Sequence, residues 1–152
     1  FGAMEWSPDG KSLALLDGAD RHDADSARLY IIDPQTSAMQ RLLPDADWDF
    51  AHIAWMNPNR IAYIADESVW TSFNRIERDG SGRQTIVAKG GPILTALSLS
   101  ADGQSAAFIA QSPAHPAEVY FMRHGDAAPR RAENFPYLSV SDSSSAAKRF
   151  GF

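Results

Sequence analysis

The chain repeats itself. MEWSPDGKSLALL at 4–16 aligns with IAWMNPNRIAYIA at 53–65 when one residue is skipped at the turn, and with LSLSADGQSAAFI at 97–109. Each copy holds a short apolar run, a turn built on Asp-Gly or Pro-Asn, and a second apolar run. A repeat of some 20–50 residues is typical of architectures made of stacked copies. This repeat therefore constrains the fold more than any other feature of the chain.

The residues after each copy repeat as well. A third run that carries an aromatic residue follows, then a tight turn and a short fourth run, the last being weak in the third copy. Short apolar runs bounded by Gly, Pro, Asp and Asn indicate strands and turns rather than helices. The third runs are 27–33, 68–76 and 117–123, and the fourth are 39–43, 83–87 and 129–132.

Three units of four strands predict an all-β chain. Units of about 40–50 residues with four strands each match β-propeller blades, so we predict three four-stranded antiparallel blades. Propellers usually close with about 4–8 blades, so these three form an incomplete propeller. The chain is then a fragment of a larger propeller, which we favour, or its copies assemble into a ring. The predicted blades cover about 3–43, 50–88 and 93–131, all within 1–131, and 132–152 forms an exit segment.

The repeated turns have residues suited to tight hairpins. Gly10 and Gly103 can take a positive φ at little cost, and Asp9 and Asp102 can hydrogen-bond the backbone of their own turns. These residues therefore indicate architecture and not a phosphate-binding loop.

The large apolar residue ahead of each turn is predicted to pack between neighbouring blades. Trp6, Trp55 and Leu99 hold this position in the three copies. One blade cannot bury both of its faces alone, so blades must stack. Since three blades leave two faces open, we expect the isolated chain to self-associate.

Composition excludes several classes of function. The 152 residues suffice for one domain with a core. A net charge of −5 and only three lysines argue against nucleic acid as a partner. The absence of cysteine excludes disulfides and zinc–thiolate sites, and no apolar stretch is long enough to span a membrane. The compartment stays open between cytoplasm and periplasm, with a slight preference for the periplasm.

One acidic loop is a candidate for Ca²⁺. The stretch DGADRHDADSA at 17–27 gathers four carboxylates and a histidine between the second and third predicted strands. The spacing is not that of an EF-hand and no Glu closes the site. A solvated loop is therefore the better interpretation. The residues concerned are Asp17, Asp20, His22, Asp23 and Asp25.

The sequence positions of the remaining histidines and tryptophans also indicate structural rather than ligand-binding roles. His52 precedes an apolar strand and His115 lies in a loop between two prolines, where it is able to face a partner domain. Among the tryptophans, Trp48 lies on a connection between blades and is the better candidate for an exposed platform for sugar or peptide. His124, Trp55 and Trp70 complete the set of residues considered, and Trp55 is predicted to be core.

No catalytic, cofactor-binding or metal-binding residue is assigned. The nucleophile elbow Gly-x-Ser-x-Gly is absent, and Ser81 lies in the Gly-rich turn 79–83. That turn lacks the Gly-Lys-Ser/Thr of a P-loop. The acidic side chains of Glu67 and Glu77 are candidates to bind the N-terminal amino group of a peptide, but no local motif supports that role.

The segment QSPAHPAEVYFMRHGDAAPRRAENFPYLS at 111–139 gives the chain its most specific resemblance. It resembles the last propeller blade of the prolyl oligopeptidase family of serine peptidases, in the acylaminoacyl peptidase and dipeptidyl-peptidase-like branch. Ala132-Glu133 departs from the usual Leu-Thr, and KRFGF at 148–152 looks like the strand that opens the hydrolase domain. The residues that fit are Ser112, Pro113, Pro116, Glu118, Val119 and Tyr120.

The resemblance implies a function for the parent protein. In that family a propeller caps an α/β-hydrolase domain with a Ser-Asp-His triad and admits only short peptides. This chain would be the non-catalytic, C-terminal part of such a propeller, with that hydrolase domain and peptide substrates as partners and no cofactor. TolB-like propellers share the blade motif, so a protein-interaction propeller without enzymatic activity is the alternative. The sequence after Phe152 would separate the two.

Overall fold

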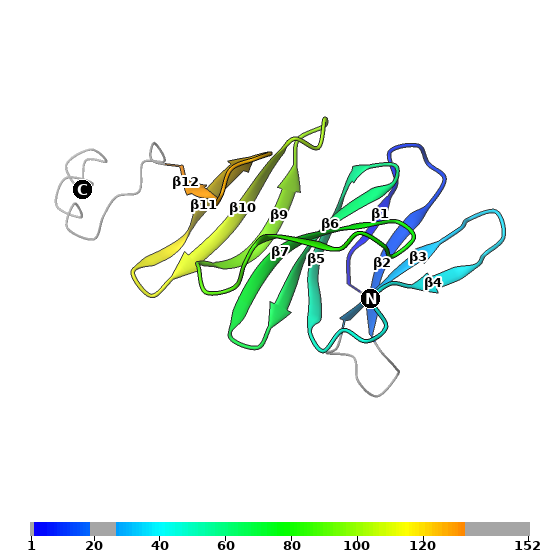
Figure 1. The fold of residues 1–152 in the computed structure, drawn as a ribbon, viewed down its shortest axis with the longest axis horizontal. Coiled ribbons are helices and arrows are strands. Elements are labelled where there is room, and N and C mark those ends of the chain that lie inside the picture. Colours follow the sequence, from blue (N-terminus) through cyan, green and yellow to red (C-terminus); the bar gives the residue numbers. More distant parts are fainter. Residues whose placement is uncertain (1, 19–26, 133–152) are drawn as a thin grey trace, which may run out of the picture.

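The computed structural model describes residues 2–18 and 27–132, and this part of the chain is all β. Three four-stranded antiparallel sheets follow one another along the chain, and each runs in sequence order (Figure 1). Blade 1 contains β1 (Met4–Trp6), β2 (Leu13–Gly18), β3 (Ala27–Ile32) and β4 (Met39–Arg41). Blade 2 contains β5 (Asp49–Asn57), β6 (Arg60–Glu67), β7 (Trp70–Glu77) and β8 (Gln84–Val87). Blade 3 contains β9 (Ile93–Leu99), β10 (Ser105–Ser112), β11 (His115–Arg123) and β12 (Arg130–Arg131).

This arrangement confirms the predicted fold class. The blades lie side by side in the order 1, 2, 3, with blade 2 in the middle (Figure 1). Strand pairing also confirms the alignment of the three copies. Trp6 pairs with Leu13, as Trp55 pairs with Ile61 and Leu99 pairs with Ala106.

Two apolar cores lie between the blades. Alternation along a strand points successive side chains to opposite faces of its sheet. In β6, Ile61 and Tyr63 join the core shared with blade 1, while Ala62 and Ile64 join the core shared with blade 3. Central strand β6 is therefore buried on both faces, which explains its nearly continuous apolar sequence.

Aromatic residues contribute to both cores. On the face of blade 2 that packs against blade 1, Phe50 of β5 packs on Tyr63 of β6 with ring centroids 5.1 Å apart. Between blades 2 and 3, Phe73 of β7 meets Phe108 of β10 edge to face at 4.9 Å. Each blade thus depends on its neighbour for burial of its largest side chains.

The prediction that Trp6 packs between blades is wrong for this chain. Trp55 is 8% exposed and donates its indole N–H to the carbonyl oxygen of Glu5 in blade 1 at 3.0 Å. Trp6 holds the equivalent position in blade 1 but is 57% exposed. The reason is that no described blade precedes blade 1, so the face that carries Trp6 has no neighbour.

The turns of the repeat have the predicted geometry. Gly10 and Gly103 both have φ near +67°. Ser7 Oγ donates to Asp9 at 2.7 Å, and the Ser100 hydroxyl donates to Asp102 in the same way. These serine hydrogen bonds are the main cause that holds the pKa of each aspartate below its usual range.

The two turn glycines differ in their surroundings. A Cβ on Gly103 would lie 2.3 Å from the carbonyl oxygen of Met56 in blade 2, whereas a Cβ on Gly10 would meet nothing within 4 Å. Gly103 therefore permits a close approach between blades, and Gly10 serves its own turn alone.

A matched pair of alanine substitutions separates these roles. Gly10→Ala should cost about 1–2 kcal/mol, the usual penalty for a side chain at positive φ. Gly103→Ala should cost at least about 1 kcal/mol more, because the new methyl group overpacks the junction. Urea unfolding followed by tryptophan fluorescence measures both, and equal losses would contradict the packing of this turn on blade 2.

Candidate binding cleft between the second and third blades

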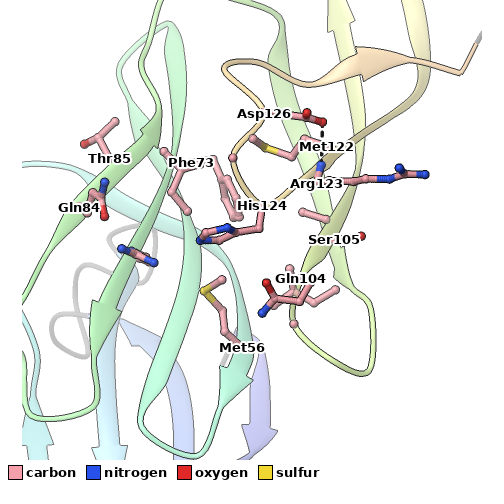
Figure 2. Close-up of a pocket in the computed structure, with 16 residues that line it drawn as sticks. Met56, Phe73, Gln84, Thr85, Gln104, Ser105, Met122, Arg123, His124 and Asp126 are labelled. Carbon is pink, nitrogen blue, oxygen red and sulfur yellow. Dashed lines mark hydrogen bonds between the residues drawn. The ribbon is translucent and has the colours of Figure 1, made fainter.

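A cleft of about 370 Å³ opens where the hairpin ends of blades 2 and 3 meet (Figure 2). It lies between β7 and β8 on one side and the β9–β10 and β11–β12 turns on the other. We call it the 2–3 cleft. Its lining residues are Met56, Phe73, Arg75, Gln84, Thr85, Ile86, Leu99, Gly103, Gln104, Ser105, Ala106, Met122, Arg123, His124, Gly125 and Asp126.

The apolar part of the 2–3 cleft continues the core between the blades. Phe73 and Met122 are buried, and Met56 and Leu99 pack against the same core while remaining partly accessible. The cleft thus has an apolar floor with flexible methionine side chains, which adapt to the shape of a small ligand.

The polar groups of the 2–3 cleft carry a positive charge. Arg75 of β7 is partly buried, and within the described residues its guanidinium makes no hydrogen bond or ion pair. Gln84 pairs with Arg75 across β7 and β8, and His124 comes from the opposite blade (Figure 2). The Thr85 hydroxyl is engaged, since it donates to Asn74 Oδ1 at 2.7 Å.

The carboxylate of Asp126 interacts with groups other than Arg75. It accepts the backbone N–H of Arg123 at 2.9 Å and forms an ion pair with Arg130 at 3.3 Å. The side chain of Arg123 points away from His124 and Phe73 (Figure 2). No described carboxylate therefore neutralises Arg75 by direct contact.

The junction between blades 1 and 2 differs at the corresponding positions. Strand pairing makes Ile31 the equivalent of Arg75, and both face the next blade. Arg78 is the equivalent of His124, and its guanidinium donates to Ser12 Oγ at 3.3 Å. The hollow there mixes Lys11 and Arg78 with Asp33 and Asp79. At the 2–3 cleft, by contrast, Arg75 lies beside an apolar floor and is not paired with a described carboxylate.

Trp48, the candidate for an exposed platform, is partly covered. It lies on the connection from β4 to β5 and packs against the core of blades 1 and 2. The Arg83 guanidinium lies over its ring, 4.4 Å from the ring centroid. Arg83 also donates through Nε to the hydroxyl of buried Tyr63 at 3.0 Å. Burial is the largest of the effects on the Tyr63 hydroxyl, and it raises the pKa of that group above its usual value.

Glu67 and Glu77 are not brought together. They lie at opposite ends of the β6–β7 hairpin, because Glu67 pairs with Trp70 and Glu77 pairs with Arg60. A hydrogen bond from Ser72 is the main cause of a lowered pKa for Glu67, which also forms an ion pair with Lys89 at 3.2 Å. Glu77 forms an ion pair with Arg60 at 2.6 Å.

The histidines are dispersed. His52 is partly buried on β5, and exposed His115 at the start of β11 lies with its Nδ1 3.4 Å from Arg131 Nη1. Only His124 contributes to the 2–3 cleft. Among the described residues, no group of histidine and carboxylate side chains is arranged to hold a metal ion.

The other predicted features lie in turns or beyond the described residues. Ser81 lies in the β7–β8 turn and donates to Asp79 at 2.6 Å, and Trp55 is core, as predicted. Asp17 lies in β2, one residue before its end, while Asp20, His22, Asp23 and Asp25 fall outside the described residues. Residues 133–152 of the predicted exit segment also fall outside. In the part of the chain that is described, no helix has the length and apolar character needed to cross a bilayer.

Comparison with known proteins identifies the fold. No protein-family model and no curated protein matches the chain by sequence. Among solved structures, TolB from Acinetobacter baumannii matches with a TM-score of 0.66 and 19% identity, over 86% of this chain and 31% of that chain. The β-propeller domain of the trilobed protease from Pyrococcus furiosus matches with a TM-score of 0.63 and 11% identity, over 84% and 36%.

A third match is Pyrococcus horikoshii acylaminoacyl peptidase, with a TM-score of 0.51 and 15% identity, over 86% of this chain and 24% of that chain. The chain therefore spans about a third or less of the length of these structures. The chain has the fold of three consecutive blades of a β-propeller.

Proposed function

We propose that the chain is a non-catalytic part of a larger β-propeller that gates and size-selects peptides for a hydrolase domain of the same parent protein. The observation that carries this proposal is the pair of open, apolar blade faces at the two ends of the stack. Support for the peptidase context comes from the propellers of two peptidases among the structural matches and from the sequence resemblance over 111–139.

The open face of blade 1 is mostly apolar, with Arg41 of β4 on the same face. Strand pairing aligns its side chains in two rows, and three of the large ones, Met4, Trp6 and Met39, are exposed. We call it the outer face of blade 1. Its apolar residues are Met4, Trp6, Leu13, Leu15, Tyr30, Ile32 and Met39.

The open face of blade 3 offers a counterpart. Ile109 and Phe121 are its exposed large residues, on β10 and β11. Glu5, whose carbonyl oxygen accepts the Trp55 indole N–H, is equivalent to Ser98 of β9. If a second copy of the chain stacked its blade 3 on blade 1 in the same way, Trp6 would be placed to donate to the carbonyl oxygen of that copy's Ser98. Self-association of the isolated chain is the expected consequence.

The alternative function is that of an interaction propeller without enzymatic activity. The match to TolB, with the higher TM-score and identity of the three, favours it. The sequence of the full gene product separates the two functions. A hydrolase strand followed downstream by Gly-x-Ser-x-Gly would support gating, whereas a further blade or a stop codon directly after Phe152 would contradict it.

The non-catalytic role predicts an inactive chain. We expect no hydrolysis of aminoacyl or peptidyl p-nitroanilides above the rate in buffer, because the chain lacks a nucleophile elbow. Release of p-nitroaniline, measured by absorbance, checks this result. Stoichiometric labelling of the chain by a serine-directed phosphonate, located by mass spectrometry, would refute the role.

A further inference from the structure

We propose that the 2–3 cleft binds a carboxylate that carries a short branched apolar group, the chemistry at the C-terminus of a peptide ending in leucine. The inference is independent of the proposed function, since it rests on one junction between blades and not on the open faces. It assigns recognition of the carboxylate to Arg75.

The first argument is the state of the Arg75 side chain. A guanidinium presents its donors as a planar fork that matches a carboxylate in two parallel hydrogen bonds. Other arginines of the chain are paired with carboxylates internally, as Arg28 is with Asp49 at 2.8 Å and Arg60 is with Glu77. Arg75 is partly buried in the cleft without such a partner among the described residues. Its donors are therefore available to a ligand at a site partly shielded from water.

The second argument is the position of Arg75 in the repeat. The equivalent residues of blades 1 and 3 are Ile31 and Phe121, both apolar. A partly buried charge costs free energy unless it is paired. Packing between blades does not require that charge, because Ile31 fills the same place in the first junction with 8% exposure. An anionic ligand would supply the missing pair.

The third argument is the chemistry around Arg75. Gln84 has an amide N–H₂ and His124 has a ring N–H in either neutral tautomer, so both are able to donate to a carboxylate. Figure 2 shows Gln84 and His124 on the two sides of the opening. The only carboxylate that lines the cleft, Asp126, is held by Arg123 and Arg130. Arg75 has donors alone, and Gln84 and His124 each have a donor to offer beside it.

The fourth argument is the size and the floor of the cleft. A volume of about 370 Å³ falls in the lower part of the range for small-ligand sites. Met56, Phe73 and Met122 form an apolar floor beside the polar groups. A ligand with a branched alkyl group next to its carboxylate would place the charge on Arg75 and the alkyl group on this floor.

The chain has a built-in set of reporters for the test. Of its four methionines, Met56 and Met122 line the 2–3 cleft, whereas Met4 and Met39 lie on the outer face of blade 1. The full chain, labelled with ¹³C at the methionine methyl groups, would be titrated with N-acetyl-Ala-Leu as the free acid and as the C-terminal amide. The free acid 4-methylpentanoate forms a third arm.

The expected result is a saturable shift of the Met56 and Met122 signals by the free acid, with Met4 and Met39 unchanged. The amide should bind at least about tenfold more weakly, since it has lost the charge. Arg75→Gln should lower the affinity for the free acid to that for the amide. The affinity for the amide itself should not change. Arg41→Gln, which removes an exposed arginine of blade 1 that does not line the cleft, should change neither by more than about twofold.

The two carboxylate arms identify the source of the ligand. Tighter binding of the acetylated dipeptide assigns the site to peptide C-termini, and equal binding of 4-methylpentanoate assigns it to free short acids. Equal affinity for acid and amide, or an Arg41→Gln loss as large as that of Arg75→Gln, would overturn the proposal. So would the absence of any shift up to about 10 mM ligand. Cooperative urea unfolding at the wild-type midpoint shows that each variant is folded.

Discussion

Phe108→Ala is expected to lower the free energy of unfolding by about 3–5 kcal/mol, the largest effect of a single substitution foreseen in this chain. Phe108 is 2% exposed and meets Phe73 across the junction of blades 2 and 3, with ring planes at 78°. Removing the ring leaves a cavity between two sheets and abolishes the edge-to-face contact. Urea unfolding at equilibrium measures the loss.

The next residue along the same strand is the control. Ile109 points to the opposite face of β10 and is 45% exposed, so Ile109→Ala should change the unfolding free energy by less than about 1 kcal/mol. A loss below about 1 kcal/mol for Phe108→Ala would mean that blades 2 and 3 do not pack as described. The pair therefore tests the stacking of the blades as well as the burial of one ring.

Trp6→Asp is expected to raise the apparent dissociation constant of self-association at least about tenfold, because an unpaired carboxylate opposes burial of the outer face of blade 1. The wild-type chain should show a mass above the 16.6 kDa of one copy, which increases with concentration. Light scattering and sedimentation velocity over a range of concentrations measure this change.

Trp70→Asp serves as the matched variant. Trp70 is 42% exposed but lies at the tip of the β6–β7 hairpin, apart from both open faces. Its substitution should leave association unchanged. A wild-type chain that remains at 16.6 kDa at all concentrations would refute self-association, and equal effects of the two substitutions would refute the role of the outer face.

Aligning the copies predicted those features that every blade has in common. The turn conformation at Gly10 and Gly103 and the burial of Trp55 follow from local residue types and their position in the repeat. Trp6 shows where such reasoning fails. Burial of that side chain depends on a neighbouring blade, and nothing in β1 or its turn reports whether that neighbour is there.

The 2–3 cleft was not predicted, because its parts come from distant hairpins. Arg75, Gln84 and His124 share no local motif, and only the packing of blade 3 on blade 2 brings them together. One signal was available in the repeat, namely a charged residue at a position that is apolar in the other two copies. The contact of Arg83 with Trp48 is likewise tertiary, since the two residues lie on different connections.

Burial of β6 on both faces has a consequence for the order in which the chain loses its structure. Blade 2 has a neighbour on each side, whereas blades 1 and 3 each have one described neighbour. In stacked repeats, stability is close to a sum of unit and nearest-neighbour terms. Opening at either end then breaks one interface, while opening of the middle blade breaks two. The outer blades should therefore fray first and exchange their amide protons sooner, leaving Ile61–Ala65 as the last protected segment.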